Sequence, residues 1–108
     1  MCAKTPRACG NLWIVVVPEE LDGAKVLKYA FVSYDVEPTG ATRHVARGVE
    51  LGPAAALAIA RYEGEEGFYL FYLDAEGAVA TDTFHESVEA ALGQAAFEYD
   101  GLHWSDVP

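Results

Sequence analysis

A run of six consecutive large apolar residues, from Phe68 to Leu73, constrains the fold more than any other stretch of this sequence. Gly67 precedes the run and Asp74 follows it, so turn-forming residues bound it on both sides. The run is too short to span a bilayer and too rich in aromatic residues to favour a short helix. Because the run has no polar side, it predicts a strand that is buried on both faces, near the middle of a sheet.

The length and composition predict one globular domain. The chain has 108 residues, of which 52% are hydrophobic and 22% are charged, so it can bury a core of its own and is not disordered. We expect a flexible N-terminal tail over residues 1–10 and a single domain over residues 11–108. No apolar segment precedes Leu12, so we expect no secretory signal and a cytoplasmic location. Cys2 and Cys9 are interpreted as incidental thiols of the tail, with a redox loop or half of a metal site as the alternative.

The chain before the aromatic run predicts three further strands. They cover about residues 12–17, 26–37 and 41–51. In the second, the apolar alternation changes face between Phe31 and Val32, which indicates either a bulge at that point or a sheet that is covered on both faces. The sequence Glu37-Pro38-Thr39-Gly40 after this strand is typical of a type I turn.

Two helices are predicted. The first begins at Gly52-Pro53 and continues to Tyr62, and since it is almost entirely Ala, Leu and Ile it should be buried on more than one side or lie in an interface. The second covers about residues 86–99, with either Thr83 and Glu86 as a capping box or Ser87 as the N-cap. Its sheet-facing positions recur at helical spacing: Val88, Ala91, Leu92, Ala95, Ala96 and Tyr99.

A weak internal repeat suggests the architecture. Residues 31–64 and 68–101 share one order of elements: a strand, a four-residue turn that ends in glycine, a strand, a helix and a glycine. With the strand at residues 12–17, the whole order is β-ββα-ββα. The predicted fold is therefore α+β, a two-layer sandwich in which an antiparallel sheet of about five strands carries two helices on one face.

The outward face of the second predicted helix is unusual. Ala90, Gly93 and Phe97 fall on the side away from the sheet. A glycine inside a helix costs about 1 kcal/mol relative to alanine, so something should pack closely against this face. The occupant is either the C-terminal segment with Trp104, or a partner protein or second subunit.

The charge is distributed unevenly along the chain. The formal net charge is −10, and eleven of the seventeen acidic residues follow Arg61, where the sequence has no further Lys or Arg. Such a field repels nucleic acids and anionic membranes and attracts a basic protein. The alternative is that the acidic residues serve solubility alone.

Residues suited to catalysis or metal binding are few. Asp82 and His85 could meet at a strand end for proton transfer, and His85 and Glu89 have the spacing of a two-ligand metal site on a helix. A histidine bonded to its own helix-cap region explains the same residues. We therefore expect no enzyme activity, no cofactor and no bound metal.

The segments Thr81-Asp82-Thr83-Phe84-His85-Glu86-Ser87 and Gln94-Ala95-Ala96-Phe97-Glu98-Tyr99, together with Trp104, resemble small uncharacterised acidic bacterial proteins. Some of these are similar to immunity proteins of polymorphic toxin systems. The resemblance covers residues 68–104, implies a non-catalytic binder of a toxin-like partner, and transfers no catalytic residue.

Together these features predict a small acidic protein-binding module, immunity-like, whose partner is a basic protein. The first alternative is a self-associating structural module that forms a homodimer, and the second is a small enzyme or metal binder at Asp82 and His85. The residues expected to form the binding site are Ala90, Gly93, Phe97, Trp104, Glu86, Glu89, Asp82 and His85.

Overall fold

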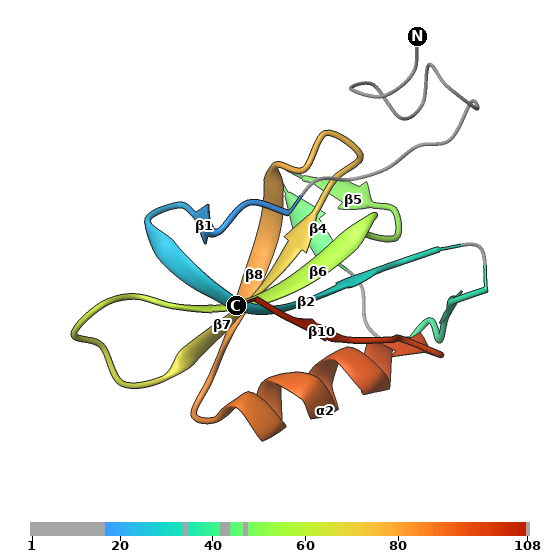
Figure 1. The fold of residues 1–108 in the computed structure, drawn as a ribbon. Coiled ribbons are helices and arrows are strands. Elements are labelled where there is room, and N and C mark those ends of the chain that lie inside the picture. The colour runs from blue at the N-terminus through green and yellow to red at the C-terminus, as the bar shows by residue number, and fades with distance from the viewer. Residues whose placement is uncertain (1–16, 34, 42–43, 47, 108) are drawn as a thin grey trace, which may run out of the picture.

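The computed structural model describes residues 17–33, 35–41, 44–46 and 48–107, and the account below is confined to them. These residues form ten strands and one helix (Figure 1). In chain order the elements are β1 (Glu20–Leu21), β2 (Ala24–Phe31), β3 (Glu37–Pro38), β4 (His44–Ala46), β5 (Val49–Leu51), β6 (Ala56–Arg61), β7 (Phe68–Leu73), β8 (Val79–His85), α2 (Val88–Glu98), β9 (Tyr99–Asp100) and β10 (Ser105–Asp106).

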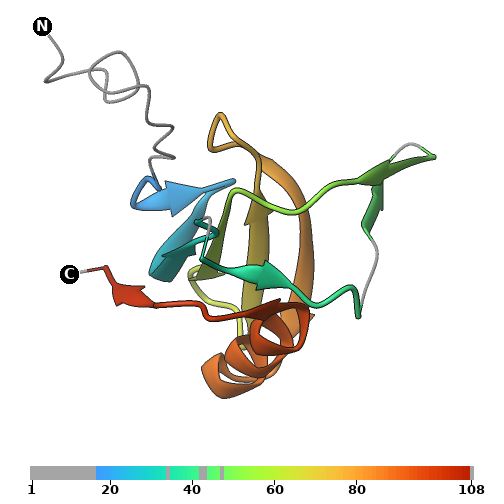
Figure 2. The same ribbon diagram turned by 90° about the vertical axis from the view of Figure 1, so that its right-hand side faces the viewer.

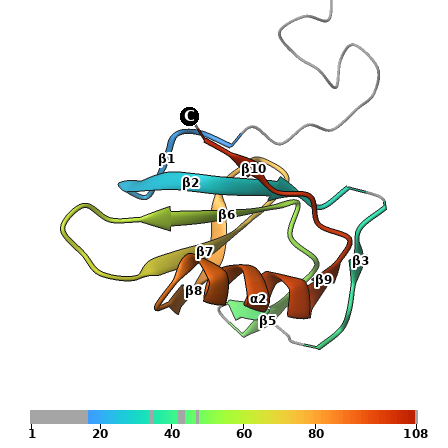
Figure 3. The ribbon, with the colours of Figure 1, turned by 60° about the horizontal axis from the view of Figure 1, so that its bottom comes forward.

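The main sheet is antiparallel and has the strand order β1-β2-β6-β7-β8. β10 pairs with β2 along the edge that β1 also uses, and β3–β9 and β4–β5 form two small separate ladders. The sheet curls into a half-barrel, with α2 lying along one side of it (Figures 2 and 3). The protein is therefore mostly β, and the expected antiparallel sheet of about five strands is confirmed.

The aromatic run behaves as its composition predicts. β7 covers Phe68–Leu73 and pairs with β6 on one side and β8 on the other. Leu70 and Tyr72 face α2, whereas Phe71 and Leu73 face the other way, and all four side chains are buried. A strand with two buried faces needs apolar residues at every position, as this one has.

The prediction of a first helix at residues 53–62 is wrong. Ala56–Arg61 is instead the central strand, β6, and five of its six residues are fully buried. Its alanines face the large rings of the neighbouring strands, since Ala58 pairs with both Tyr29 of β2 and Phe71 of β7. Small side chains are needed between two aromatic rows, and this packing outweighs the helix propensity of alanine.

The two faces of the sheet carry separate cores. Leu57, Ile59, Leu70 and Tyr72 pack against α2 on one face. The opposite face holds a second cluster that contains Val26, Ala58, Phe71 and Leu73. Only one face is covered by a helix among the described residues, so the sandwich with two helices on one face is corrected to a curled sheet with one helix. The predicted internal repeat is wrong as well, because residues 68–101 contain the helix α2 whereas the described part of residues 31–64 contains only strands.

The remaining strand predictions are confirmed only in part. β2 ends at Phe31, and its irregularity lies between Val26 and Lys28. Neither explanation of the change of face at Phe31 holds: Phe31 is 41% exposed, and the change falls where β2 ends, with Val32 after the strand packed against the cluster under α2. The long strand expected at residues 41–51 is a short hairpin, β4–β5. The strand expected at residues 12–17, apart from Val17, and the tail with Cys2 and Cys9 lie outside the described residues.

The predicted second helix is confirmed as α2. Ser87 is its N-cap, since the Ser87 hydroxyl accepts a hydrogen bond from the Ala90 N–H at 3.0 Å. Thr83 lies inside β8, so the alternative capping box does not form. Within the described part of the chain, no helix has the length and hydropathy needed to cross a membrane.

Candidate functional site

The outward face of α2 is an open, largely apolar surface. Ala90, Gly93, Ala96 and Phe97 are all exposed, and Phe97 retains 56% of its accessible surface. A Cβ added to Gly93 would meet no described atom within 4 Å. We call Ala90, Gly93, Ala96 and Phe97 the α2 outer face.

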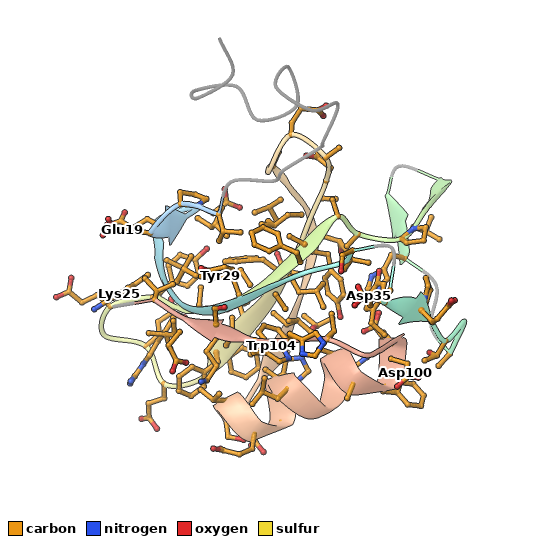
Figure 4. All side chains as sticks on the ribbon, turned by 45° about the vertical axis from the view of Figure 1, so that its right-hand side comes forward. Glu19, Lys25, Tyr29, Asp35, Asp100 and Trp104 are labelled. Carbon is orange, nitrogen blue, oxygen red and sulfur yellow. The ribbon has the colours of Figure 1, made fainter. Side chains whose placement is uncertain are left out.

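Acidic residues lie at both ends of the α2 outer face. Glu86 and Glu89 are exposed at the start of the helix, and Asp100 is exposed just after its end (Figure 4). Among the described residues, none of these three carboxylates has a basic side chain within 4 Å. The surface therefore combines an exposed aromatic ring with uncompensated negative charge.

Trp104 lies on the other side of the helix. It packs against the cluster between α2 and the sheet together with Leu102 and Val36, and it is half-buried there (Figure 4). The C-terminal segment then continues into β10 beside β2. Of the eight predicted site residues, five share one surface: Glu86, Glu89, Ala90, Gly93 and Phe97.

Asp82 and His85 do not come together. Asp82 pairs with Phe71 and His85 with Phe68, and since these positions alternate along β7 the two side chains lie on opposite faces of the sheet. The His85 Nε2 lies 2.7 Å from the Thr83 hydroxyl, and burial lowers the pKa of His85. His85 ends β8 rather than beginning a helix, so the helical spacing to Glu89 is not formed. The described residues contain no group of three or more candidate metal ligands.

A polar cluster that the sequence analysis missed surrounds Glu98. This carboxylate is buried, with 3% of its side chain exposed. Its Oε2 accepts hydrogen bonds from the Tyr72 hydroxyl at 2.5 Å and from Gln94 Nε2 at 2.6 Å, while its Oε1 lies 2.6 Å from His44 Nε2. Several partners are what a buried carboxylate requires to offset its lost hydration.

The Glu98 cluster joins three elements of the fold. His44 comes from β4, Tyr72 from β7, and Gln94 and Glu98 from α2. The His44 ring also lies against the Tyr72 ring, with 4.3 Å between their centroids. Burial and the hydrogen bond to Glu98 raise the pKa of Tyr72 far above its usual value, so its hydroxyl stays protonated and donates to Glu98.

A cavity of about 140 Å³ lies beside this cluster. Tyr72, Leu73 and Tyr99 form buried parts of its wall, and His44, Pro53 and Thr81 also line it. The Tyr99 hydroxyl accepts a hydrogen bond from the Ala54 N–H at 2.8 Å, which fixes the wall on that side.

The sequence does contain one signal for the Glu98 cluster. Glu98 stands seven residues after Ala91 and three after Ala95, so it belongs to the buried stripe of the helix. A carboxylate in such a stripe must have a partner inside the protein. The identity of that partner could not be predicted, because His44 is 54 residues away on a separate hairpin.

Comparison with known proteins gives no family for this chain. No family model, curated protein or solved structure matches it.

Proposed function

We propose that this protein is a small, non-catalytic binding module that recognises a basic protein partner through the α2 outer face. The observation that carries the proposal is Phe97, an aromatic side chain left 56% exposed on a well-packed helix with acidic residues at both ends. Aromatic side chains are enriched at protein interfaces and supply much of their binding energy.

The neighbours of Phe97 favour close approach by a partner. Ala90 has only a methyl side chain and Gly93 has none, so a partner side chain can approach the helix backbone beside the Phe97 ring. Burying that ring would contribute on the order of 1–2 kcal/mol. The opposite side of α2 is fixed against the sheet by Ala91 and Ala95, so the surface is rigid before binding.

The charge supports a basic partner rather than a second copy of this chain. Two α2 outer faces placed against each other in antiparallel orientation would bring Glu86 and Glu89 of one copy toward Asp100 of the other, which is unfavourable. The sequence also suggested a homodimer interface on an apolar first helix. The residues predicted for that helix form the buried strand β6, so they offer no surface for self-association. Lys28 pairs with Asp106 on the β2–β10 edge, at 2.5 Å, so within the described part of the chain it does not compensate Glu86, Glu89 or Asp100.

The resemblance of residues 68–104 to immunity-like proteins fits this role. A protein of that kind blocks its target by covering a surface, and needs neither a catalytic group nor a cofactor. In this proposal Glu86, Glu89 and Asp100 steer a basic target toward the helix, and the contact with Phe97 retains it.

Affinity capture from the native host with a matched pair of variants tests the proposal. Phe97→Ser removes the exposed ring of the α2 outer face, and Phe84→Ser removes a ring of similar exposure, 53%, from the opposite face of the sheet. The proposal expects a basic protein that is captured by the wild type and by Phe84→Ser, is lost with Phe97→Ser, and is released by high salt. A captured partner that is acidic, or that is retained by Phe97→Ser, would overturn it.

A further inference from the structure

The cavity beside the Glu98 cluster has properties of a preformed ligand site. Leu73, Tyr72 and Tyr99, which line it, are only 0%, 2% and 5% exposed. These side chains are held by the sheet, by the Tyr72–Glu98 hydrogen bond and by the Ala54–Tyr99 hydrogen bond. A rigid apolar wall with a few fixed polar groups is typical of small-molecule sites.

His44 is one of the polar residues that line this site, together with Asp74 and Thr81. The Nε2 of His44 lies 2.6 Å from the Glu98 carboxylate, which accepts hydrogen bonds, so Nε2 carries a proton; when the ring is neutral, Nδ1 is left as an acceptor. Among the described residues no hydrogen bond to Nδ1 is found. His44 lines the cavity and its side chain is 21% exposed, so a bound molecule can reach this ring.

The volume sets the size of the ligand. An apolar cavity of about 150 Å³ accommodates a benzene ring, and the cavity beside His44 has about 140 Å³. One six-membered ring with a small substituent therefore fills it. The wall is mainly apolar, with Pro53, Leu73 and the tyrosine rings. The Asp74 carboxylate also lines it, and its Oδ1 already accepts hydrogen bonds from the N–H groups of Glu76 and Ala78. This lining favours a neutral ligand over a charged one.

We propose that this cavity binds a small neutral ring compound that carries one hydrogen-bond donor, and that the donor bonds to Nδ1 of His44. A phenol is the simplest member of the class. None of the residues of the α2 outer face lines this cavity, so the test of the ligand site does not depend on the proposed protein partner.

A titration of the full-length, isotope-labelled protein with phenol, followed by NMR, tests this site. We expect saturable shifts at Ala54, Tyr72 and Thr81, and a change at His44 Nδ1 in a spectrum of the imidazole nitrogens. Toluene has the same ring without the donor, so it should bind about two- to tenfold more weakly and leave Nδ1 unchanged.

Two variants test the contribution of the cavity space and the contribution of His44 to binding separately. Ala80→Leu enlarges an exposed side chain at the cavity rim without touching the Glu98 cluster, and should abolish phenol binding. His44→Phe should reduce the preference for phenol over toluene, and its folding is checked by the dispersion of the same spectrum. Absence of saturable binding to the wild type, equal binding of phenol and toluene, or unchanged binding by Ala80→Leu would each overturn the proposal.

Discussion

The imidazole Nε2 of His44 and the carboxylate Oε1 of Glu98 lie 2.6 Å apart, although 54 residues separate them in the sequence. This contact joins the β4–β5 hairpin to the last turn of α2. The same carboxylate also accepts from Tyr72 and Gln94, so one side chain links a hairpin, the helix and the sheet. The position of the hairpin therefore depends on a polar contact as well as on apolar packing.

Glu98→Gln should destabilise the protein by about 2–3 kcal/mol. The amide oxygen of the glutamine can replace only one carboxylate oxygen: if it accepts from the Tyr72 hydroxyl and Gln94 Nε2, the amide N–H₂ faces His44 Nε2, and the contact of His44 with a carboxylate is lost. Urea denaturation followed by circular dichroism measures the change. Glu89→Gln is the matched control, because Glu89 is exposed on the same helix and should change stability by less than about 0.5 kcal/mol. Equal stability of the two variants would contradict the role given to Glu98.

Ala58→Leu tests why β6 is a strand. Ala58 is fully buried between Tyr29 and Phe71, so three extra carbon atoms have no space there and should cost about 1–3 kcal/mol. Ala96→Leu places the same side chain on the exposed side of α2 and should be close to neutral. If Ala58→Leu were tolerated as well as Ala96→Leu, the tight packing of alanine against the two rings would be refuted.

The contrast between β6 and β7 shows how far the sequence predicts this fold. The aromatic residues of β7 strongly favour a strand, and Ser87 and the apolar stripe beginning at Val88 mark the helix α2. Residues 56–61 consist largely of helix formers, and what makes them a strand is the pair of aromatic rows on β2 and β7. That pairing is nonlocal, so no local pattern in the sequence could reveal it.

The candidate site, like the fold, has some features that the sequence predicts and others that depend on nonlocal packing. Most of the α2 outer face follows from helical periodicity, since Ala90, Gly93 and Phe97 are exposed as the spacing predicts. The prediction that Ala96 faces the sheet is wrong, because Ala96 is exposed and Glu98 takes a buried position instead. The position of Trp104 depends on how the chain turns after Gly101, and the separation of Asp82 from His85 depends on β8 extending through His85. The His44–Glu98 contact depends on where a three-residue strand packs. Tertiary packing, rather than periodicity, decides these three features.

Gly67→Ala should destabilise the protein by about 1–3 kcal/mol. Gly67 has φ +103°, a conformation that favours glycine, and a Cβ there would overlap the Phe84 ring. Gly52→Ala is the control, because Gly52 lacks a positive φ and has open space around it. The double variant Gly67→Ala with Phe84→Ala should recover the part of the loss that is due to the clash. Thermal unfolding of the four proteins measures these effects, and a neutral Gly67→Ala would contradict the close approach of Phe84.

His85 should make the protein less stable in mild acid. Burial lowers its pKa in the folded state, against a partial opposing attraction by Glu98, so the unfolded chain binds a proton at this residue more readily. The free energy of unfolding therefore falls as the pH drops through the unfolded-state pKa of about 6.5, and continues to fall until the lowered folded-state pKa is reached. Denaturation of the wild type and His85→Gln between about pH 7.5 and 5.5 isolates this contribution. The slope with pH should be smaller for His85→Gln; identical slopes would contradict the burial of His85.

The most direct test of the proposed function is to map by NMR where a basic, amphipathic peptide of lysine and leucine contacts the protein. The proposal predicts amide shifts concentrated at Glu89, Gly93 and Phe97, which weaken with salt, are lost in Phe97→Ser and persist in Phe84→Ser. A matched peptide of glutamate and leucine should cause no shifts there. Shifts confined to the acidic β6–β7 turn at Glu63, Glu65 and Glu66, or shifts unaffected by Phe97→Ser, would contradict a binding role for the α2 outer face.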